Sequence, residues 1–232
     1  VVEKLAAEAL QNRTSRKKAA VGLALASELV SGGEFLQESW ERKEALLDPL
    51  VGYMMSNPDR SERAQAGRLV RCLLQSLDFA ELEQIFRASP FPQFRGFVVD
   101  EMRKAYFADR IAQNRMETFL LDILASEFHP SRVPELHAAC VALQGAKAMN
   151  RQGAWVDQEA FANVLAELKQ KASTVYDDAE FTMPRIAQSE QEEGTRQHGE
   201  DEFYGPPLRD REASFQMELM LFLDALNQTI ST

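Results

Sequence analysis

The residues best suited to metal chemistry are His137 and Cys140, which lie three positions apart in a helical pattern, with His129 eight residues before His137. At this spacing an imidazole and a thiolate share one helix face, within reach of a single zinc ion. A closed zinc site needs four ligands, and the sequence offers no fourth at a suitable spacing. We interpret His137 as a helical histidine beside a core cysteine, and we expect no metal and no cofactor.

Two pairs of adjacent carboxylates, Asp100-Glu101 and Asp177-Asp178, are the other candidates for chemistry. Neighbouring side chains on a helix point to different faces, so neither pair forms an acid–base dyad, and we expect both pairs on the solvated surface. The sequence also lacks the short motifs of nucleotide-binding loops, serine hydrolases, zinc proteases and thiol oxidoreductases. We therefore predict that the protein is not an enzyme.

Basic residues are the stronger functional signal in this acidic protein. If successive helices present one face, a first set of basic residues lines a strip that binds an acidic partner segment. The alternative is that these residues lie on ordinary solvated helix faces and form i, i+4 ion pairs. A second basic group lies where a helix starts and where the helix dipole disfavours positive charge, which favours a contact role there. The first set is Arg60, Arg63, Arg68, Arg71, Arg87, Arg95, Arg103 and Lys104, and the second is Arg13, Arg16, Lys17 and Lys18.

The segment 177–210 has a different composition from the rest of the chain. Between Asp177 and Glu202 nine acidic residues face two basic ones, and no helical face is evident. Low hydrophobicity with high charge does not offset the entropy of ordering, so we predict an acidic flexible loop. Its function is either to keep the protein soluble or to serve as a recognition arm, in which Phe203 and Tyr204 are the aromatic anchor.

The elements that must position these residues are helices. Apolar residues recur three and four positions apart through most of the chain, and no alternating run of β-branched residues predicts a strand. Asp48-Pro49 and Asn57-Pro58 each place a capping side chain before a proline at a first helical position. The predicted helices cover residues 3–11, 16–31, 34–46, 49–55, 59–77, 79–88, 92–108, 112–128, 133–150, 157–175 and 211–230.

The apolar stripes of these helices predict the core. The segment 59–175 is expected to form one continuous helical core, onto which the closing helix 211–230 packs. Both cysteines, Cys72 and Cys140, are expected to be buried and reduced. The core residues are Leu73, Leu74, Phe94, Val98, Phe161, Leu165 and Leu168, and those of the closing helix are Phe215, Leu219, Phe222, Leu223 and Leu226.

Short connections between helices are typical of antiparallel hairpins stacked in series. Because no exact period repeats, we predict an all-α fold of stacked antiparallel helix pairs, an α-solenoid of the HEAT or armadillo kind. We predict a single helical-repeat domain over 1–232. Since the first residue is Val1 rather than Met, we expect this domain to be the C-terminal part of a longer chain.

Composition restricts the location and the partners. A net charge of −10 argues against general nucleic-acid binding, which needs a basic footprint. Two cysteines are too few for a disulfide framework and indicate a reducing compartment. No apolar run reaches the roughly 18 residues of a membrane span, and no signal peptide opens the chain. We predict a cytoplasmic protein, with the nucleus as a second location, that binds neither nucleic acid nor membrane.

The stretch 82–106, LEQIFRASPFPQFRGFVVDEMRKAY, resembles the Ser/Cys-Pro-Phe-Pro element and long helix of the glomulin family. Before it, LLDPLVGYMMSNPDRSERAQAGRLVRCLLQSL is similar to the family's helix pair with an Asn-Pro turn. After it, the acidic insertion and the closing helix REASFQMELMLFLDALNQTI follow in the family's order. The resemblance covers residues 35–230, and its motifs are structural, so no individual contact residue is carried over.

The glomulin resemblance implies a helical-repeat adaptor without enzymatic activity. The family includes the animal inhibitor of cullin–RING ubiquitin ligases and fungal binders of an oxidant-responsive bZIP factor. It therefore implies a role in ubiquitin-ligase regulation or stress response, with a RING-box subunit or a bZIP factor as the partner. The expected function is a protein-binding adaptor or inhibitor. The alternatives are a helical enzyme with a dispersed site and a structural subunit of a larger assembly.

Overall fold

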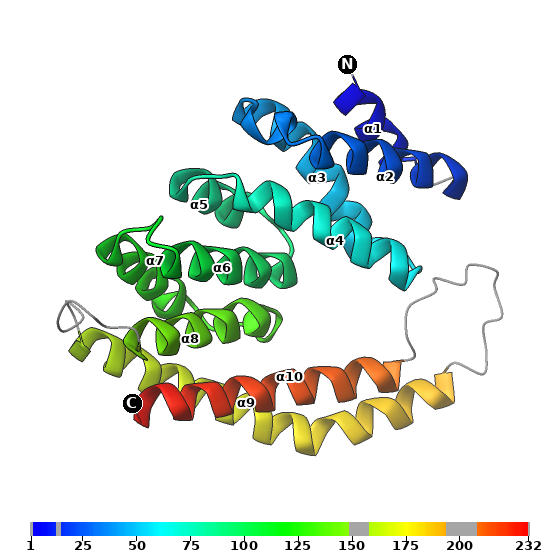
Figure 1. Cartoon of the computed structure of the whole chain (residues 1–232). Helices are drawn as coiled ribbons and strands as arrows, with labels where there is room; N and C mark the ends of the chain where they lie inside the picture. Colours follow the sequence, from blue (N-terminus) through cyan, green and yellow to red (C-terminus); the bar gives the residue numbers. More distant parts are fainter. Residues whose placement is uncertain (1, 13–14, 149–157, 194–207, 232) are drawn as a thin grey trace. The chain divides into compact units, whose positions relative to one another are not determined.

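The computed structural model describes residues 2–12, 15–148, 158–193 and 208–231, and in the last two helices the side chains of 159–177 and 215–230. Every regular element in these ranges is a helix, so the predicted all-α class is confirmed (Figure 1). Packing divides the chain into two compact units, Val1–Ala88 (unit 1) and Ser89–Thr232 (unit 2). The single domain stays a prediction, and the two units are described separately.

Unit 1 is built from two helical hairpins that pack on each other. Helix α1 contacts α2 and α3, and α4 contacts α3 and α2. The α1–α2 contact is close because Gly22 has no side chain: a Cβ there would lie 2.8 Å from Leu10 N. The elements are α1 (Val2–Leu10), α2 (Arg16–Ser31), the 3-10 turn η1 (Glu34–Gln37), α3 (Trp40–Ser56), α4 (Arg60–Gln75) and α5 (Phe79–Ala88).

Unit 2 has its most extensive contact between α6 and α8, and α10 packs on α8 and α9. The backbones of α6 and α8 approach closely at Gly96, where a Cβ would lie 2.8 Å from Pro134 O. Helix α7 contacts α8 and α9. The elements are α6 (Pro92–Phe107), α7 (Gln113–Ala125), the 3-10 turn η2 (Pro130–Arg132), α8 (Val133–Ala148), α9 (Gln158–Glu193) and α10 (Leu208–Ser231).

The prediction that a helix ends before Pro49 is wrong. Only the short turn η1 forms after Gly33, and α3 then runs from Trp40 to Ser56 with Pro49 inside it. A proline inside a helix costs about 3 kcal/mol. The buried stripe of Leu46, Leu47 and Leu50 continues across Pro49, and its burial offsets that cost.

The acidic segment is more helical than expected. Helix α9 extends to Glu193, so the loop predicted from residue 177 is wrong for its first half, and α10 begins at Leu208. Extending an existing helix past Asp177 adds one hydrogen bond for each residue that is fixed, without the cost of starting a new helix. Composition alone does not reveal this gain. Residues 194–207 lie outside the described part of the chain, and the predicted flexibility stays a prediction.

The predicted core is largely confirmed. Leu73, Leu74, Phe94, Val98, Phe161, Leu165 and Leu168 are all buried, although they are shared between the two units. In α10, Leu219, Phe222 and Leu226 are buried, whereas Phe215 and Leu223 are only partly so. Cys140 is buried as predicted. The prediction for Cys72 is wrong, because this residue is exposed on α4.

Candidate protein-binding surface

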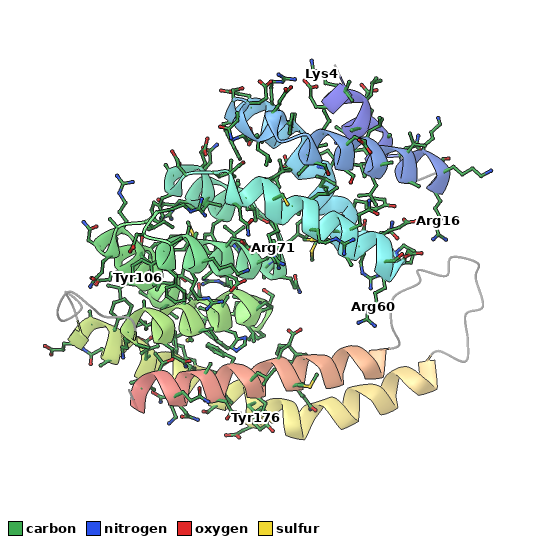
Figure 2. All side chains as sticks on the ribbon, in the orientation of Figure 1. Lys4, Arg16, Arg60, Arg71, Tyr106 and Tyr176 are labelled. Atoms are coloured by element: carbon green, nitrogen blue, oxygen red, sulfur yellow. The ribbon has the colours of Figure 1, made fainter. Side chains whose placement is uncertain are left out.

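Arg16 fixes the start of α2 beside the start of α4. Its Nη2 donates a 2.6 Å hydrogen bond to Asp59 Oδ2 and lies 3.5 Å from Glu62 Oε1. Asp59 is also the N-cap of α4, where its Oδ1 accepts from the backbone N–H groups of Ser61 and Glu62. Figure 2 shows Arg16 and Arg60 at the same end of unit 1. The contact therefore brings the first turns of two helices together.

A hydrogen-bonded cluster around Glu62 makes this junction rigid. Tyr53 Oη donates to Glu62 Oε2, and Asn57 Nδ2 donates to the same oxygen at 2.9 Å. Both bonds lower the pKa of the Glu62 carboxyl. The pKa of Tyr53 is raised to about 12, mainly by burial and in second place by the hydrogen bond to Glu62. Both shifts favour the protonation states that these two groups ordinarily have at neutral pH.

The exposed side of α4 is basic and free of acid. Its exposed residues are Arg60, Ser61, Ala64, Arg68, Arg71, Cys72 and Gln75. Within the described ranges the side chains of Arg60 and Arg68 form no ion pair or hydrogen bond. At 1.5 Å per residue, Arg60 and Arg71 lie about 16 Å apart along the axis. Three of the predicted arginines thus share one exposed helix face.

Lys17 and Lys18 follow Arg16 at the start of α2, the helix that Arg16 links to the start of α4. Both are exposed, and their side chains have no ion-pair partner among the described residues. The first turn of α2 contains no acidic residue. We use the name basic surface for Lys17, Lys18, Arg60, Arg68 and Arg71, which all belong to unit 1. The sequence predicted these residues but not the Arg16 contacts that join the two helices.

Arg63 does not belong to the basic surface. Its Nη1 donates to the backbone oxygens of Asn57 and Pro58 at 2.6 and 2.8 Å. The guanidinium therefore closes the turn between α3 and α4. Arg87, another residue of the predicted strip, pairs with Glu83 at 2.7 Å along α5.

In unit 2, Arg95 and Arg132 both pair with Glu135, whose side chain is fully buried. Arg95 Nε lies 2.5 Å from Glu135 Oε2, but the two atoms do not have hydrogen-bond geometry. At this distance the opposite charges form an ion pair. The contact connects α6 to α8, and the predicted binding role of Arg95 stays a prediction.

Arg103 and Lys104 also form ion pairs within unit 2. Arg103 Nη2 donates to Asp100 Oδ1 at 2.6 Å, and Lys104 Nζ lies 2.7 Å from both Asp100 Oδ2 and Glu101 Oε1. Burial raises the pKa of Asp100, but the bonds from Lys104 and Arg103 outweigh it and lower the pKa overall. Glu101 is buried, so the expectation that this carboxylate pair is solvated surface is wrong. Arg103 is thus paired within its own helix, and its place in the predicted strip stays a prediction.

Some predicted residues lie outside the description. Phe203, Tyr204 and Arg13 fall in ranges that the structure does not describe. Among the described residues, histidine, cysteine and carboxylate side chains do not gather in groups of three. Burial lowers the pKa of His137 and raises that of Cys140 to about 12, so both are neutral at pH 7. No helix in the described ranges is long and apolar enough to cross a membrane.

Comparisons with known proteins give no family for the chain. No protein-family model matches the sequence, and no curated protein is significantly similar to it. The basic surface is therefore the feature of the chain that bears on its function.

Proposed function

We propose that the protein is a non-enzymatic binding module whose basic surface holds an acidic segment of a partner protein. The observation that carries this proposal is the exposed face of α4, where Arg60 and Arg68 have no ion-pair partner among the described residues. Arginines of unit 2 with similar sequence patterns, Arg95 and Arg103, are paired internally. The unpaired cations of unit 1 are therefore available to a carboxylate of another chain.

The position of the lysines on α2 supports the same conclusion. Positive charge near a helix N-terminus opposes the helix dipole and costs about 0.3–1 kcal/mol per residue. Lys17 and Lys18 lie in the first turn of α2, and no acidic residue of that turn compensates them. Contact of Lys17 and Lys18 with a partner protein would explain why positive charge lies where it destabilises the helix.

The helix contacts support a HEAT-like stack as the scaffold. In unit 1, α1 lies against α3 and α2 against α4, which is the pattern of two stacked hairpins. In unit 2, contacts of α6 with α8 and of α8 with α10 form one row, and α7 with α9 forms the other. Such scaffolds present long binding faces. As the glomulin resemblance implies, the partner classes to test first are a RING-box subunit and a bZIP factor.

The test is binding of a synthetic acidic peptide of about 16 residues to the full chain, measured by fluorescence anisotropy at two salt concentrations. We expect Arg60→Glu with Arg68→Glu to weaken binding about five- to thirtyfold, because two attractions become repulsions of about 0.5–1 kcal/mol each. Raising the salt concentration should also weaken binding of the peptide to the unmodified protein, because salt screens exposed charges.

The matched control is Lys4→Glu with Lys169→Glu. These lysines are exposed and without an ion pair in the described ranges, and they lie off the basic surface. The control changes net charge by the same amount, so it should leave binding within about twofold. Equal weakening by both double variants would mean that only net charge is recognised. Tighter binding of a DNA duplex than of the peptide would contradict a protein partner.

A further inference from the structure

Helix α10 exposes three large apolar side chains on one face. Met217 is 57% exposed, and Met220 and Leu221 are each 46% exposed. Single exposed apolar residues are common on protein surfaces. Three within five consecutive positions, at i, i+3 and i+4, form a continuous patch instead. We call these residues the methionine patch.

The orientation of the methionine patch is fixed by the opposite face of the helix. Leu219, Phe222 and Leu226 are buried, and the Phe222 ring stacks on Phe128 with centroids 6.4 Å apart. Gln144 of α8 donates to Ala225 O at 2.7 Å and to Thr229 Oγ1 at 2.8 Å. Rotation of α10 to bury the patch would break these contacts.

The described side chains of α10 place only negative charge beside the methionine patch. Glu218 and Asp224 are the charged residues of α10 among its described side chains, and both are exposed. Neither forms an ion pair in the described part of the chain. Burial raises the pKa of Glu218, so its carboxylate is partly desolvated without a compensating cation. The patch therefore combines apolar area with unneutralised negative charge.

We infer that the methionine patch of α10 docks an amphipathic helix of a partner protein that carries basic residues beside its apolar face. Methionine side chains adapt to apolar partners of different shape, which suits a helix-in-groove or helix-on-helix contact. The basic residues of the partner would pair with Glu218 and Asp224, so charge complementarity decides between a basic and an acidic helix. The surface is on unit 2 and is independent of the proposed function.

The experiment titrates the full chain with a synthetic amphipathic peptide of about 18 residues that has leucines at helical spacing flanked by lysines. We expect a micromolar dissociation constant by calorimetry. Met217→Ser with Leu221→Ser should weaken binding about tenfold or more, since it removes the apolar centre. Glu218→Gln with Asp224→Asn should weaken it about threefold and reduce its salt dependence.

Two controls make the result specific. Val21→Ser changes an apolar residue of unit 1 that is also 57% exposed, and it should leave the affinity unchanged. A peptide with glutamate in place of lysine should bind at least about tenfold more weakly, because its charges repel the acidic rim. Equal binding of the two peptides, or no effect of the serine double variant, overturns the inference.

Two further measurements cover the competing explanations. Circular dichroism melting should give the same midpoint for the serine double variant as for the unmodified protein. A clear drop would show that the patch is covered by the chain itself in solution, and the inference would be wrong. Sedimentation should show a monomer. A dimer that the serine variant abolishes would assign the patch to a second copy.

Discussion

In unit 1, Arg60 and Arg68 extend into solvent, whereas in unit 2 Arg95 and Arg132 both end on the buried carboxylate of Glu135. The two units also differ in charge: unit 1 has 12 basic and 13 acidic residues, and unit 2 has 14 and 23. An arginine in a helical sequence pattern can thus either extend into solvent or pair with a carboxylate inside the fold. Whether a carboxylate reaches the guanidinium, from the same helix or from another, determines which of the two applies.

The comparison also separates two kinds of polar cluster. The cluster of unit 1 around Glu62 is partly open to water and is built from neutral and charged hydrogen bonds. Glu135 in unit 2 has no exposed surface. An uncompensated charge costs far more in the second environment than in the first. Substitutions in the two clusters should therefore have different effects on stability.

The largest effect is expected for Glu135→Ala. Glu135→Ala removes the buried carboxylate that pairs with Arg95 and Arg132, and loss of one partner of a buried ion pair costs about 3–5 kcal/mol of unfolding free energy. Urea denaturation measures the loss. Glu83→Ala, which removes an exposed pair with Arg87, is the matched control and should cost less than about 1 kcal/mol. Similar losses for the two variants would show that burial does not distinguish these pairs.

Leu73→Ala tests the apolar core of unit 1. Leu73 is fully buried, so its truncation should lower the unfolding free energy by about 2–5 kcal/mol. The neighbouring substitution Cys72→Ala lies on the exposed side of the same helix and should change stability by about 0.5 kcal/mol at most. A loss below about 1 kcal/mol for Leu73→Ala would mean that the α4 stripe does not carry the core.

Two glycines should respond to alanine with opposite signs. At Gly96 a Cβ would meet Pro134 O at 2.8 Å, so Gly96→Ala should destabilise unit 2 by about 1–3 kcal/mol through overpacking. At Gly52 in α3 nothing lies within 4 Å, so Gly52→Ala should stabilise unit 1 by up to about 1 kcal/mol through helix propensity. Thermal melting measures both. The same sign for both would contradict the close α6–α8 contact.

The smallest effect concerns acid stability. Hydrogen bonds from Ser61 and from the Glu62 and Ser61 backbone lower the pKa of Asp59 to about 2, from an ordinary value of 3.8. A lowered pKa contributes stability that is present above the ordinary value and is lost as the pH falls toward 2. Asp59→Asn should therefore flatten the loss of stability between pH 4 and 2. Denaturation at successive pH values measures this, and an unchanged slope would contradict it.

Much of the fold could be predicted because helix burial is a local pattern. The stripes that contain Leu73, Phe94 and Leu165 have helical spacing, and all three residues are buried as expected. Pro49 shows the limit of a local rule, since packing of the surrounding leucines outweighs the proline. Composition has a similar limit, since it predicted a loop from residue 177, where α9 continues to Glu193.

Local pairs such as Arg87–Glu83 agree with the i, i+4 alternative, but the pairing of Arg95 could not be predicted from the sequence. Arg95 and Glu135 lie on different helices, and their contact depends on the close approach of α6 and α8 at Gly96. Glu101 was likewise expected in solvent, yet its helix face is buried. Among the eight basic residues of the predicted strip, Arg60 and Arg68 form no ion pair in the described ranges, and the strip itself stays a prediction.

The exposure of Cys72 gives the protein a built-in reporter position. The chain has two cysteines, and Cys140 is buried with a pKa raised to about 12, so its thiol stays protonated and out of reach of reagents. A maleimide dye should therefore attach at Cys72 alone, beside Arg71 on α4. Its emission would follow occupancy of this helix face in the native sequence, without any engineered residue.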